Sequence, residues 1–113
     1  MKYTKSIKKN HDFQKIYKQG KSYANKYLVM YVLENEKNEN RLGISVSKKV
    51  GNSVIRHRIT RLIREAYRLS ELFFRCGIDI IIVARVAAKE INYFEIKSAL
   101  KHLGKLHQIY IRK

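Results

Sequence analysis

The sequence predicts an α+β fold, a two-layer α/β sandwich with elements in the order α-β-β-α-β-α. Apolar residues recur every three or four positions between Ile55 and Leu69, which is the spacing of one side of an α-helix. The run Ile78–Ala84 is almost continuously β-branched, as in a strand buried on both faces. Asn92 followed by Glu95 forms a capping-box pattern, which predicts that a last helix begins there.

The composition predicts one small domain that binds polyanions. The 113 residues contain no proline, and we find no internal repeat or linker, so a single domain is expected over residues 1–113. The chain has 25 Lys and Arg against 9 Asp and Glu, a formal net charge of +16. Such an excess favours nucleic acid or an anionic membrane surface as the partner.

Of these two possible partners, the sequence favours a membrane surface less than nucleic acid. No run approaches 18 apolar residues, and no charged segment precedes a short apolar one as in a signal peptide. The single Cys76 excludes an internal disulfide and any zinc finger, and it fits a reducing compartment. We therefore expect a soluble, cytoplasmic protein that binds nucleic acid, with no membrane and no small-molecule cofactor.

The N-terminal quarter carries basic and aromatic residues. Residues 1–9 are basic and lack periodicity, so a mobile or extended basic arm is expected there. Asn10 can cap a helix that ends before Gly20. Phe13 and Tyr17 share one side of this helix, where they are either core residues or aromatic platforms for unpaired bases.

Two strands should follow. Tyr27–Leu33 is apolar on both faces, Glu34–Asn40 is a polar turn, and Arg41–Ser47 alternates apolar with small residues. Ser45 and Ser47 fall on the small-residue face of the second strand. That face is either an ordinary solvent-exposed sheet surface or an open floor that a ligand backbone can approach.

The stretch VSKKVGNSVIRHRITRLIREAYR holds most of the information on function. Gly51 and Asn52 interrupt the chain before a helix that is apolar on one side and basic on the other. Its basic residues, with the two lysines that precede it, are Lys48, Lys49, Arg56, Arg58, Arg61, Arg64 and Arg68. Glu65 is the single acid. Because arginine binds phosphate in a bidentate manner, we interpret this side as a surface for a polyphosphate backbone rather than a merely solvated one.

The sequence shows no arrangement of residues by which the protein itself could catalyse a reaction. The nine acids are scattered, the four histidines lack metal-ligand spacing, and no GxxxxGK[ST] phosphate loop occurs. Glu65 is expected to pair with Arg61 or Arg68 rather than to hold a metal ion. We therefore expect no catalytic residue and no metal ligand in this chain.

The stretch ISVSKKVGNSVIRHRITRLIREAYR resembles the "RNR" signature of the bacterial ribonuclease P protein subunit family. The flanks IKKNHDFQKIYKQGKSYAN and DIIIVAR, with the terminal amphipathic helix, resemble the same family, so the likeness covers the whole chain. It implies an α+β sandwich with a left-handed βαβ crossover, whereas periodicity alone would favour the common right hand. It also implies a ribonucleoprotein endonuclease, a hydrolase of tRNA processing in which the RNA subunit with Mg²⁺ removes the 5′ leader and leaves a 5′-phosphate.

The resemblance also assigns roles to residues. It implies RNA-subunit binding by the basic signature and its flanks: Lys48, Lys49, Asn52, Arg56, His57, Arg58, Arg61, Arg64 and Arg68. It implies binding of the precursor-tRNA leader in a cleft by Phe13, Tyr17, Tyr31, Ser45 and Ser47. His57 stands where the family usually has Asn, and Thr60 where Lys or Arg is common.

Three functions remain open from the sequence. The leading one is the protein subunit of ribonuclease P, with ribonuclease P RNA and precursor tRNA as partners and Mg²⁺ held mainly by the RNA. The alternative is a structural RNA-binding protein such as a ribosomal component. A self-sufficient nuclease would require Glu65 to take part in Mg²⁺-dependent cleavage.

Overall fold

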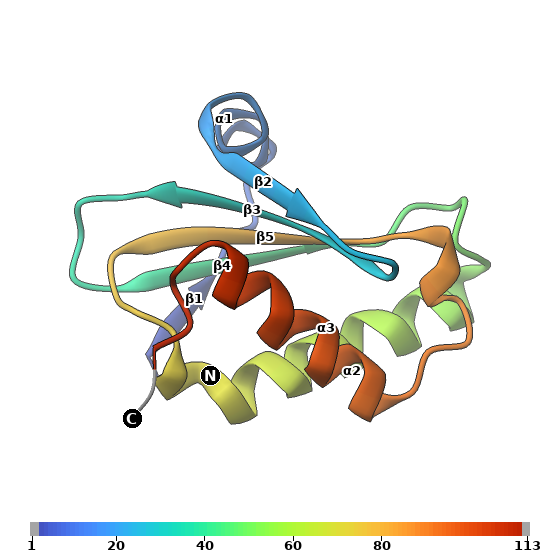
Figure 1. The fold of residues 1–113 in the computed structure, drawn as a ribbon. Helices are drawn as coiled ribbons and strands as arrows, with labels where there is room; N and C mark the ends of the chain where they lie inside the picture. Colours follow the sequence, from blue (N-terminus) through green and yellow to red (C-terminus); the bar gives the residue numbers. More distant parts are fainter. Residues whose placement is uncertain (1–2, 112–113) are drawn as a thin grey trace.

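A computed structural model describes residues 3–111 of the chain, which form one mixed sheet flanked by helices (Figure 1). In chain order the elements are β1 (Thr4–Ser6), α1 (Asn10–Gln19), β2 (Lys21–Ala24), β3 (Leu28–Glu34), β4 (Asn40–Ser45), α2 (Ser53–Ser70), β5 (Ile78–Ala84) and α3 (Tyr93–Leu106). Short 3-10 helices at Glu71–Phe73 and Val86–Ala88 flank β5. The α+β class is confirmed, as is the order of the three helices and the three long strands.

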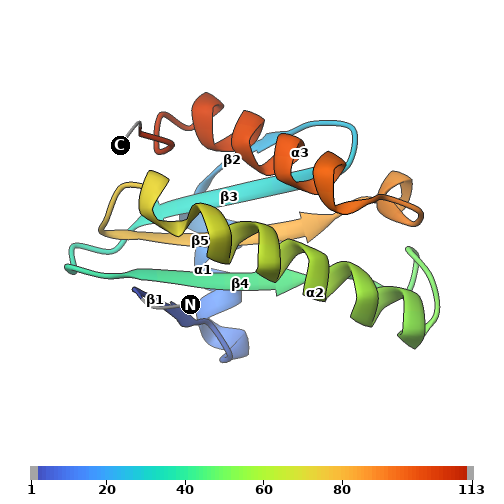
Figure 2. The same cartoon turned by 90° about the horizontal axis from the view of Figure 1, so that it is seen from below.

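The sheet has the order β1-β4-β5-β3-β2. Its centre is the parallel pair β4 and β5, which α2 connects, while β3 pairs with β5 in the antiparallel sense. In Figure 2 both parallel strands run to the right behind α2, and the chain moves from β4 up to β5, which makes the crossover left-handed. The hand implied by the family resemblance is thus present, against the right-handed rule for such connections.

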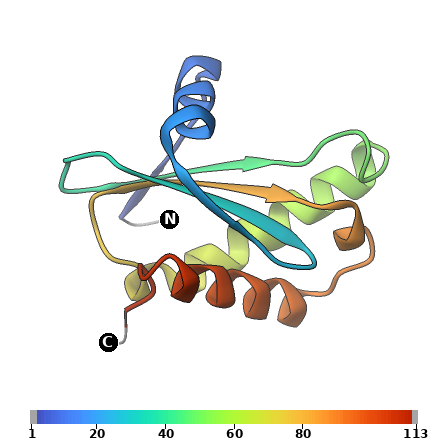
Figure 3. The ribbon, with the colours of Figure 1, turned by 45° about the horizontal axis from the view of Figure 1, so that its top comes forward.

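Helices lie on both faces of the sheet rather than on one. α2 and α3 cover one face, and α1 stands on the other (Figures 1 and 3). The larger core lies under α2 and α3 and includes Met30, Ile59, Ile80 and Leu100. The second, smaller cluster lies under α1 and is built on Ile7, Ile16 and Ile81. β5 therefore contributes to both clusters, which explains its almost continuous run of apolar residues.

The N-terminal segment departs from the sequence expectation. Thr4–Ser6 pairs in parallel with β4, and Ile7 is buried under α1, so this part of residues 1–9 is not a mobile arm. The hydroxyl groups of Thr4 and Tyr67 lie 2.9 Å apart in a buried hydrogen bond that joins β1 to α2. Residues 1 and 2 lie outside the described residues.

Three local predictions were wrong. Asn10 is the first residue of α1 rather than its cap, a position that Lys9 occupies without a side-chain hydrogen bond. Leu69 is 56% exposed, because the buried side of α2 continues through Tyr67 and Ser70. Leu106, which the apolar spacing of the last helix also predicts on its core side, is exposed at the end of α3. By contrast, the predicted capping box before α3 is present, with both reciprocal hydrogen bonds of its two side chains.

Candidate nucleic-acid interface

The start of α2 is fixed by Asn52. Its side-chain oxygen accepts a hydrogen bond from the backbone N–H of Ile55 at 3.0 Å, which satisfies one of the free donors of the first turn. The same helix buries Ile59, Ile63 and Ala66 completely against the sheet. Since this side is sealed in the core, the residues between these positions must face solvent or a partner.

The basic residues of α2 occupy three different environments. His57, Arg61 and Arg64 are exposed on the solvent side, as predicted for a binding surface. Arg58 turns toward the chain just before α3, where its Nη2 donates to the carbonyl of Ile91 at 2.6 Å. Arg56 is half-buried, and its Nε has no hydrogen-bond acceptor among the described residues. α2 thus brings the predicted arginines together, but it gives Arg58 an additional structural contact.

Arg68 is paired with an acid. Its guanidinium donates to both carboxylate oxygens of Glu65 one turn earlier, and the hydrogen bond to Arg68 lowers the pKa of Glu65. This confirms the expectation that Glu65 pairs with Arg61 or Arg68. The pair reduces the charge that Arg68 offers to a phosphate, so Arg61 and Arg64 are the freer cations of this helix.

The two departures from the family pattern lie on this helix as well. His57 is exposed beside the arginines. Thr60 is half-buried, and its hydroxyl donates to the carbonyl of Arg56 at 2.9 Å. Thr60 therefore satisfies its own polar group within the helix, whereas His57 remains available to a ligand.

The basic surface continues at both ends of α2. Lys48 and Lys49 are exposed in the loop between β4 and α2. Arg64 lines a small hollow of about 160 Å³ together with Lys8, at the edge formed by β1 and β4. Cations therefore run from the end of β4 along α2 to the beginning of α1.

The predicted aromatic residues meet on the opposite face of the sheet. The ring centroids of Phe13 and Tyr17 lie 6.1 Å apart, and those of Tyr17 and Tyr31 lie 4.9 Å apart in an edge-to-face contact. All three residues are half-buried between α1 and the sheet. A Cβ atom on Gly43 would lie 2.7 Å from Cζ of Phe13, so the absence of a side chain at this position lets the ring approach the sheet. We call this group of three rings the aromatic cleft, after the leader-binding cleft that the family resemblance implies.

The floor beside the aromatic cleft is formed by the ends of three adjacent strands. Ser45 is in register with Val83, which is in register with Val29, and all three are half-exposed. Ser47 lies beyond the end of β4 and is exposed in a separate hollow that also contains Lys49. The structure therefore brings Ser45 to the cleft floor, while Ser47 lies on the path from that floor to the basic loop.

An ion-pair network that the sequence reading missed joins α1 to the sheet. Arg41 on β4 contacts Asp79 on β5, with Nη2 to Oδ2 at 2.6 Å and Nε to Oδ1 at 2.9 Å. Its Nη1 also reaches Asp12 of α1 at 3.3 Å. The available signal was a lone acid in the apolar run Ile78–Ala84, because a buried carboxylate needs a partner.

This network shifts the pKa values of Asp79 and Arg41. Burial works to raise the pKa of Asp79, but hydrogen bonds from Arg41 and Asn35 outweigh it and hold the pKa below its ordinary value. The hydrogen bond to Asp79 in turn raises the pKa of Arg41. Both groups are therefore charged, and their pair joins β4 to β5. The contact of Arg41 with Asp12 fixes α1, which carries two of the cleft aromatics, against the sheet.

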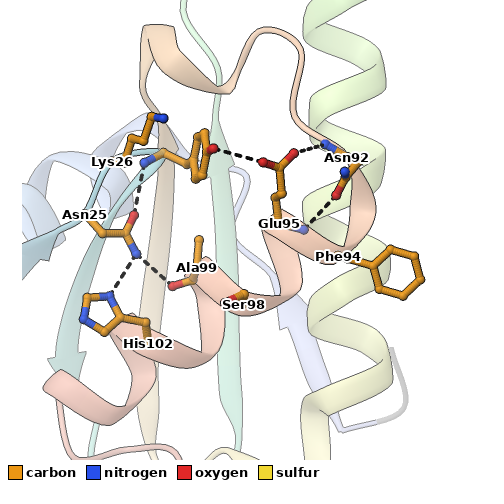
Figure 4. A pocket seen from close by; sticks show the side chains of 9 residues that line it. Asn25, Lys26, Asn92, Phe94, Glu95, Ser98, Ala99 and His102 are labelled. Atoms are coloured by element: carbon orange, nitrogen blue, oxygen red, sulfur yellow. Dashed lines mark hydrogen bonds between the residues drawn. The ribbon is translucent and has the colours of Figure 1, made fainter.

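A further pocket lies between the β2–β3 turn and α3 (Figure 4). Its polar side chains are bonded to one another: Asn25 contacts the carbonyl of Ala99 and the ring of His102, and the Tyr27 hydroxyl donates to Glu95. These groups hold the turn onto α3. We therefore treat the pocket as a structural junction.

Among residues 3–111, no three His, Cys, Asp or Glu side chains gather as ligands for a metal ion. In the same part of the chain, no helix is both long enough and apolar enough to cross a membrane.

Together, the left-handed crossover, the basic crossover helix and the aromatic cleft define a class of small basic α+β proteins. The sequence model of the family described as Ribonuclease P matches residues 1–107. The chain belongs to the ribonuclease P protein family. Membership places it on the protein side of ribonuclease P, the endoribonuclease that processes tRNA 5′ ends.

Curated relatives and solved structures agree with this assignment. The ribonuclease P protein component of Lachnoclostridium phytofermentans is 63% identical over 106 residues, covering 94% of this chain and 91% of that protein. The component of Clostridioides difficile is 50% identical and covers 96% of each chain. The RNase P protein of Staphylococcus aureus superposes with a TM-score of 0.86 at 44% identity, covering 93% of this chain and 96% of that one. That of Thermotoga maritima gives 0.81 at 28% identity, covering 88% and 94%.

Proposed function

We propose that this chain binds the ribonuclease P RNA through the solvent side of α2 and the precursor-tRNA 5′ leader through the aromatic cleft. The observation that carries the proposal is that the two sides of α2 differ. Its apolar side is buried in the core, whereas Arg61 and Arg64 project from its solvent side and have no acidic partner among the described residues. Arginine forms bidentate contacts with phosphate oxygens and releases counterions from the RNA on binding.

The aromatic cleft suits a single strand. Unpaired bases stack on aromatic rings, and the half-exposed Phe13, Tyr17 and Tyr31 offer three rings beside an open floor. A paired acceptor stem keeps its bases stacked inside the helix, so it has no base to place there. The cleft thereby favours precursor tRNA over mature tRNA.

Cleavage itself is assigned to the RNA subunit. Mg²⁺ held mainly by the RNA would activate the attacking water and stabilise the leaving oxygen, which leaves a 5′-phosphate on the tRNA. This chain's own residues bind and orient: the arginines neutralise phosphate charge, and the cleft holds the leader in place. We further place the protein in the cytoplasm, in agreement with the free, exposed thiol of Cys76.

The test is reconstitution with the ribonuclease P RNA of the same genome. The protein alone should cut nothing, and it should lower the Mg²⁺ concentration that the RNA needs to process precursor tRNA. If the protein leaves that requirement unchanged, the assignment fails.

If ribosomal RNA rather than ribonuclease P RNA co-purifies with the protein, the structural RNA-binding alternative is favoured. Mg²⁺-dependent cleavage by RNA-free protein, lost in Glu65→Gln, would support the nuclease alternative.

Variants of α2 locate the RNA contact. Arg61→Ala and Arg64→Ala should each weaken binding of the RNA subunit and reduce the slope of log affinity against log salt by about 0.7–0.9 per lost phosphate contact. Lys37→Ala, in the exposed β3–β4 turn, removes the same charge elsewhere and should leave the slope nearly unchanged. Equal effects from all three variants would indicate general attraction rather than a defined surface.

A further inference from the structure

A second basic surface lies between the C-terminal halves of α2 and α3, apart from the aromatic cleft. It is a groove of about 500 Å³ whose lining includes Leu69, Phe73, Lys97, Lys101, Lys105 and Tyr110. Among the described residues that line this groove, none is acidic. We call it the α2–α3 groove, and the proposed contacts of α2 and the cleft do not use it.

The cations of the groove form a regular row. Lys97, Lys101 and Lys105 are exposed at every fourth position of α3, so they project from the same side about 6 Å apart along the axis. Within residues 3–111, none of the three forms an ion pair, and Lys101 has only the ring of Tyr110 near its ammonium group, at 5.9 Å. Three unpaired cations in a row can bind anionic groups at a similar spacing.

The opposite wall of the groove is aromatic and rigid. The rings of Phe73 and Tyr110 are nearly parallel, with centroids 5.5 Å apart and an interplanar angle of 8°. The chain turns back after α3 at Gln108, which has a φ of 60°. The carbonyl of the buried Ile109 then accepts a hydrogen bond from the backbone of Arg75 at 2.8 Å.

Gly104 makes this arrangement possible. A Cβ atom at this position would lie 3.0 Å from Cβ of Tyr110, so glycine lets the returning segment lie directly on α3. The aromatic wall is thereby held in place before any ligand arrives. A platform fixed in advance reduces the entropy that binding would cost.

The chemistry of the two walls identifies the partner. A row of cations facing preformed aromatic rings matches a strand with regularly spaced phosphates and unpaired bases. A paired helix offers phosphates but no base face. The groove is also continuous with α2, because Leu69 lines it and is the neighbour of Arg68. An RNA that lies along the basic side of α2 therefore passes its edge.

We propose that the α2–α3 groove binds an unpaired segment of the RNA subunit, with phosphates on the three lysines and a base against the Phe73–Tyr110 wall. This inference rests on the proposed function of α2. It adds a second point of attachment for the RNA, on the side of α2 that faces α3. The leader cleft is not part of it.

The charge test uses the full-length protein and the reconstituted RNA subunit. The triple variant Lys97→Ala/Lys101→Ala/Lys105→Ala should bind the RNA more weakly, with the salt slope reduced by about 0.7 for each lost contact to a single strand. The matched control, Lys15→Ala/Lys18→Ala/Lys37→Ala, removes the same charge from exposed sites on α1 and the β3–β4 turn. It should retain the wild-type slope. Equal slopes for the two triple variants would overturn the proposal.

The aromatic test changes no charge. Tyr110→Leu should weaken RNA binding about tenfold with an unchanged salt slope, because stacking but no phosphate contact is lost. Thermal unfolding of each variant shows whether it folds, and the lysine variant remains decisive if Tyr110→Leu does not. Cross-linking of 4-thiouridine-containing RNA to Phe73 or Tyr110 should be detected by mass spectrometry. Cross-links confined to α2 would contradict the site.

The outcomes separate this inference from the proposed function. If Arg61→Ala and Arg64→Ala weaken RNA binding while the triple lysine variant binds as the wild type does, only the groove proposal fails. If none of these variants matters, the function proposed for α2 fails as well. Loss of binding to anionic phospholipid vesicles, with RNA binding intact in the triple variant, would make the groove a membrane surface and overturn the RNA assignment.

Discussion

Phe13 shows how one side chain can serve both folding and binding. Its ring rests over Gly43 and contacts Tyr17, yet it is only half-buried. The sequence left two roles open for this residue, a core aromatic or a platform for bases. In the structure, one part of the ring packs on the sheet while another remains exposed at the cleft, so the ring is open to the proposed base.

Phe13→Ala should therefore weaken binding of leader-bearing precursor tRNA to the holoenzyme by about 1–3 kcal/mol, through lost stacking. Binding of mature tRNA should be unchanged. Phe94→Ala is the matched control, because Phe94 is 76% exposed on α3 and lies outside the cleft. Equilibrium binding with both tRNA forms measures the difference, and an equal loss for the two forms would show that Phe13 acts only in the core.

At the scale of the element, the two polar atoms of the Asn52 amide that caps α2 have different surroundings. The Asn52 side chain satisfies the backbone of Ile55, and its amide NH₂ has no partner among the described residues. The oxygen therefore stabilises the helix, while the NH₂ is available to RNA. This separation can be tested because serine caps helices about as well as asparagine does.

Asn52→Ala should lower the free energy of unfolding by about 1 kcal/mol, whereas Asn52→Ser should retain it within a few tenths of a kcal/mol. Both variants should weaken binding of the RNA subunit, since both lose the NH₂ group. Urea denaturation and RNA titration measure the two effects. Full RNA affinity in Asn52→Ser would limit the role of Asn52 to capping.

The elements that the sequence predicts correctly are those in which apolar residues recur at regular intervals. α2, α3 and β5 each bury a regular set of apolar residues, and β5 was placed at Ile78–Ala84 as the structure has it. β1 and β2 were missed because they are short and mostly exposed, so that hydrogen bonding to β4 and β3 defines them rather than a hydrophobic pattern. The left hand of the crossover followed from the family resemblance, since local periodicity carries no information on handedness.

The residues of the candidate site also fall into two groups: those that local spacing predicts and those that only the fold brings together. Phe13 and Tyr17 lie one helical turn apart, so their shared side was readable from the sequence. Arg41, Asp12 and Asp79 come from three elements that are distant along the chain, and only the fold shows that they meet. The wall of the α2–α3 groove was missed for the same reason, because its two rings belong to separate segments.

At the scale of the whole molecule, Arg41 joins three elements, because it pairs with Asp79 on the adjacent strand β5 and also reaches Asp12 of α1. Because the folded-state pKa of Asp79 is depressed, the carboxylate stabilises the protein above the ordinary carboxyl range near pH 4, and this contribution is lost as the pH falls further. The free energy of unfolding should therefore fall on acidification, and less steeply in Asp79→Asn. Urea denaturation at a series of pH values from about 3 to about 7 measures this dependence.

Removing the cation should be more damaging than removing the acid's charge. Arg41→Ala leaves Asp79 almost fully buried without its main partner, which should cost about 3 kcal/mol of folding free energy. It also frees α1 from β4, so affinity for the leader should fall in the fraction that remains folded.

Equal pH dependence in the wild type and Asp79→Asn would show that other carboxylates govern acid unfolding.

The pairing of β1 with β4 also constrains the order of events during synthesis. Thr4–Ser6 leaves the ribosome well before its hydrogen-bonding partners on β4 and the hydroxyl of Tyr67. At about 5–20 residues per second, the interval before Tyr67 appears lasts several seconds. The sheet edge made by β1 is therefore completed only after α2 has emerged. An extension fused ahead of β1 would have to leave that strand free to dock during this interval.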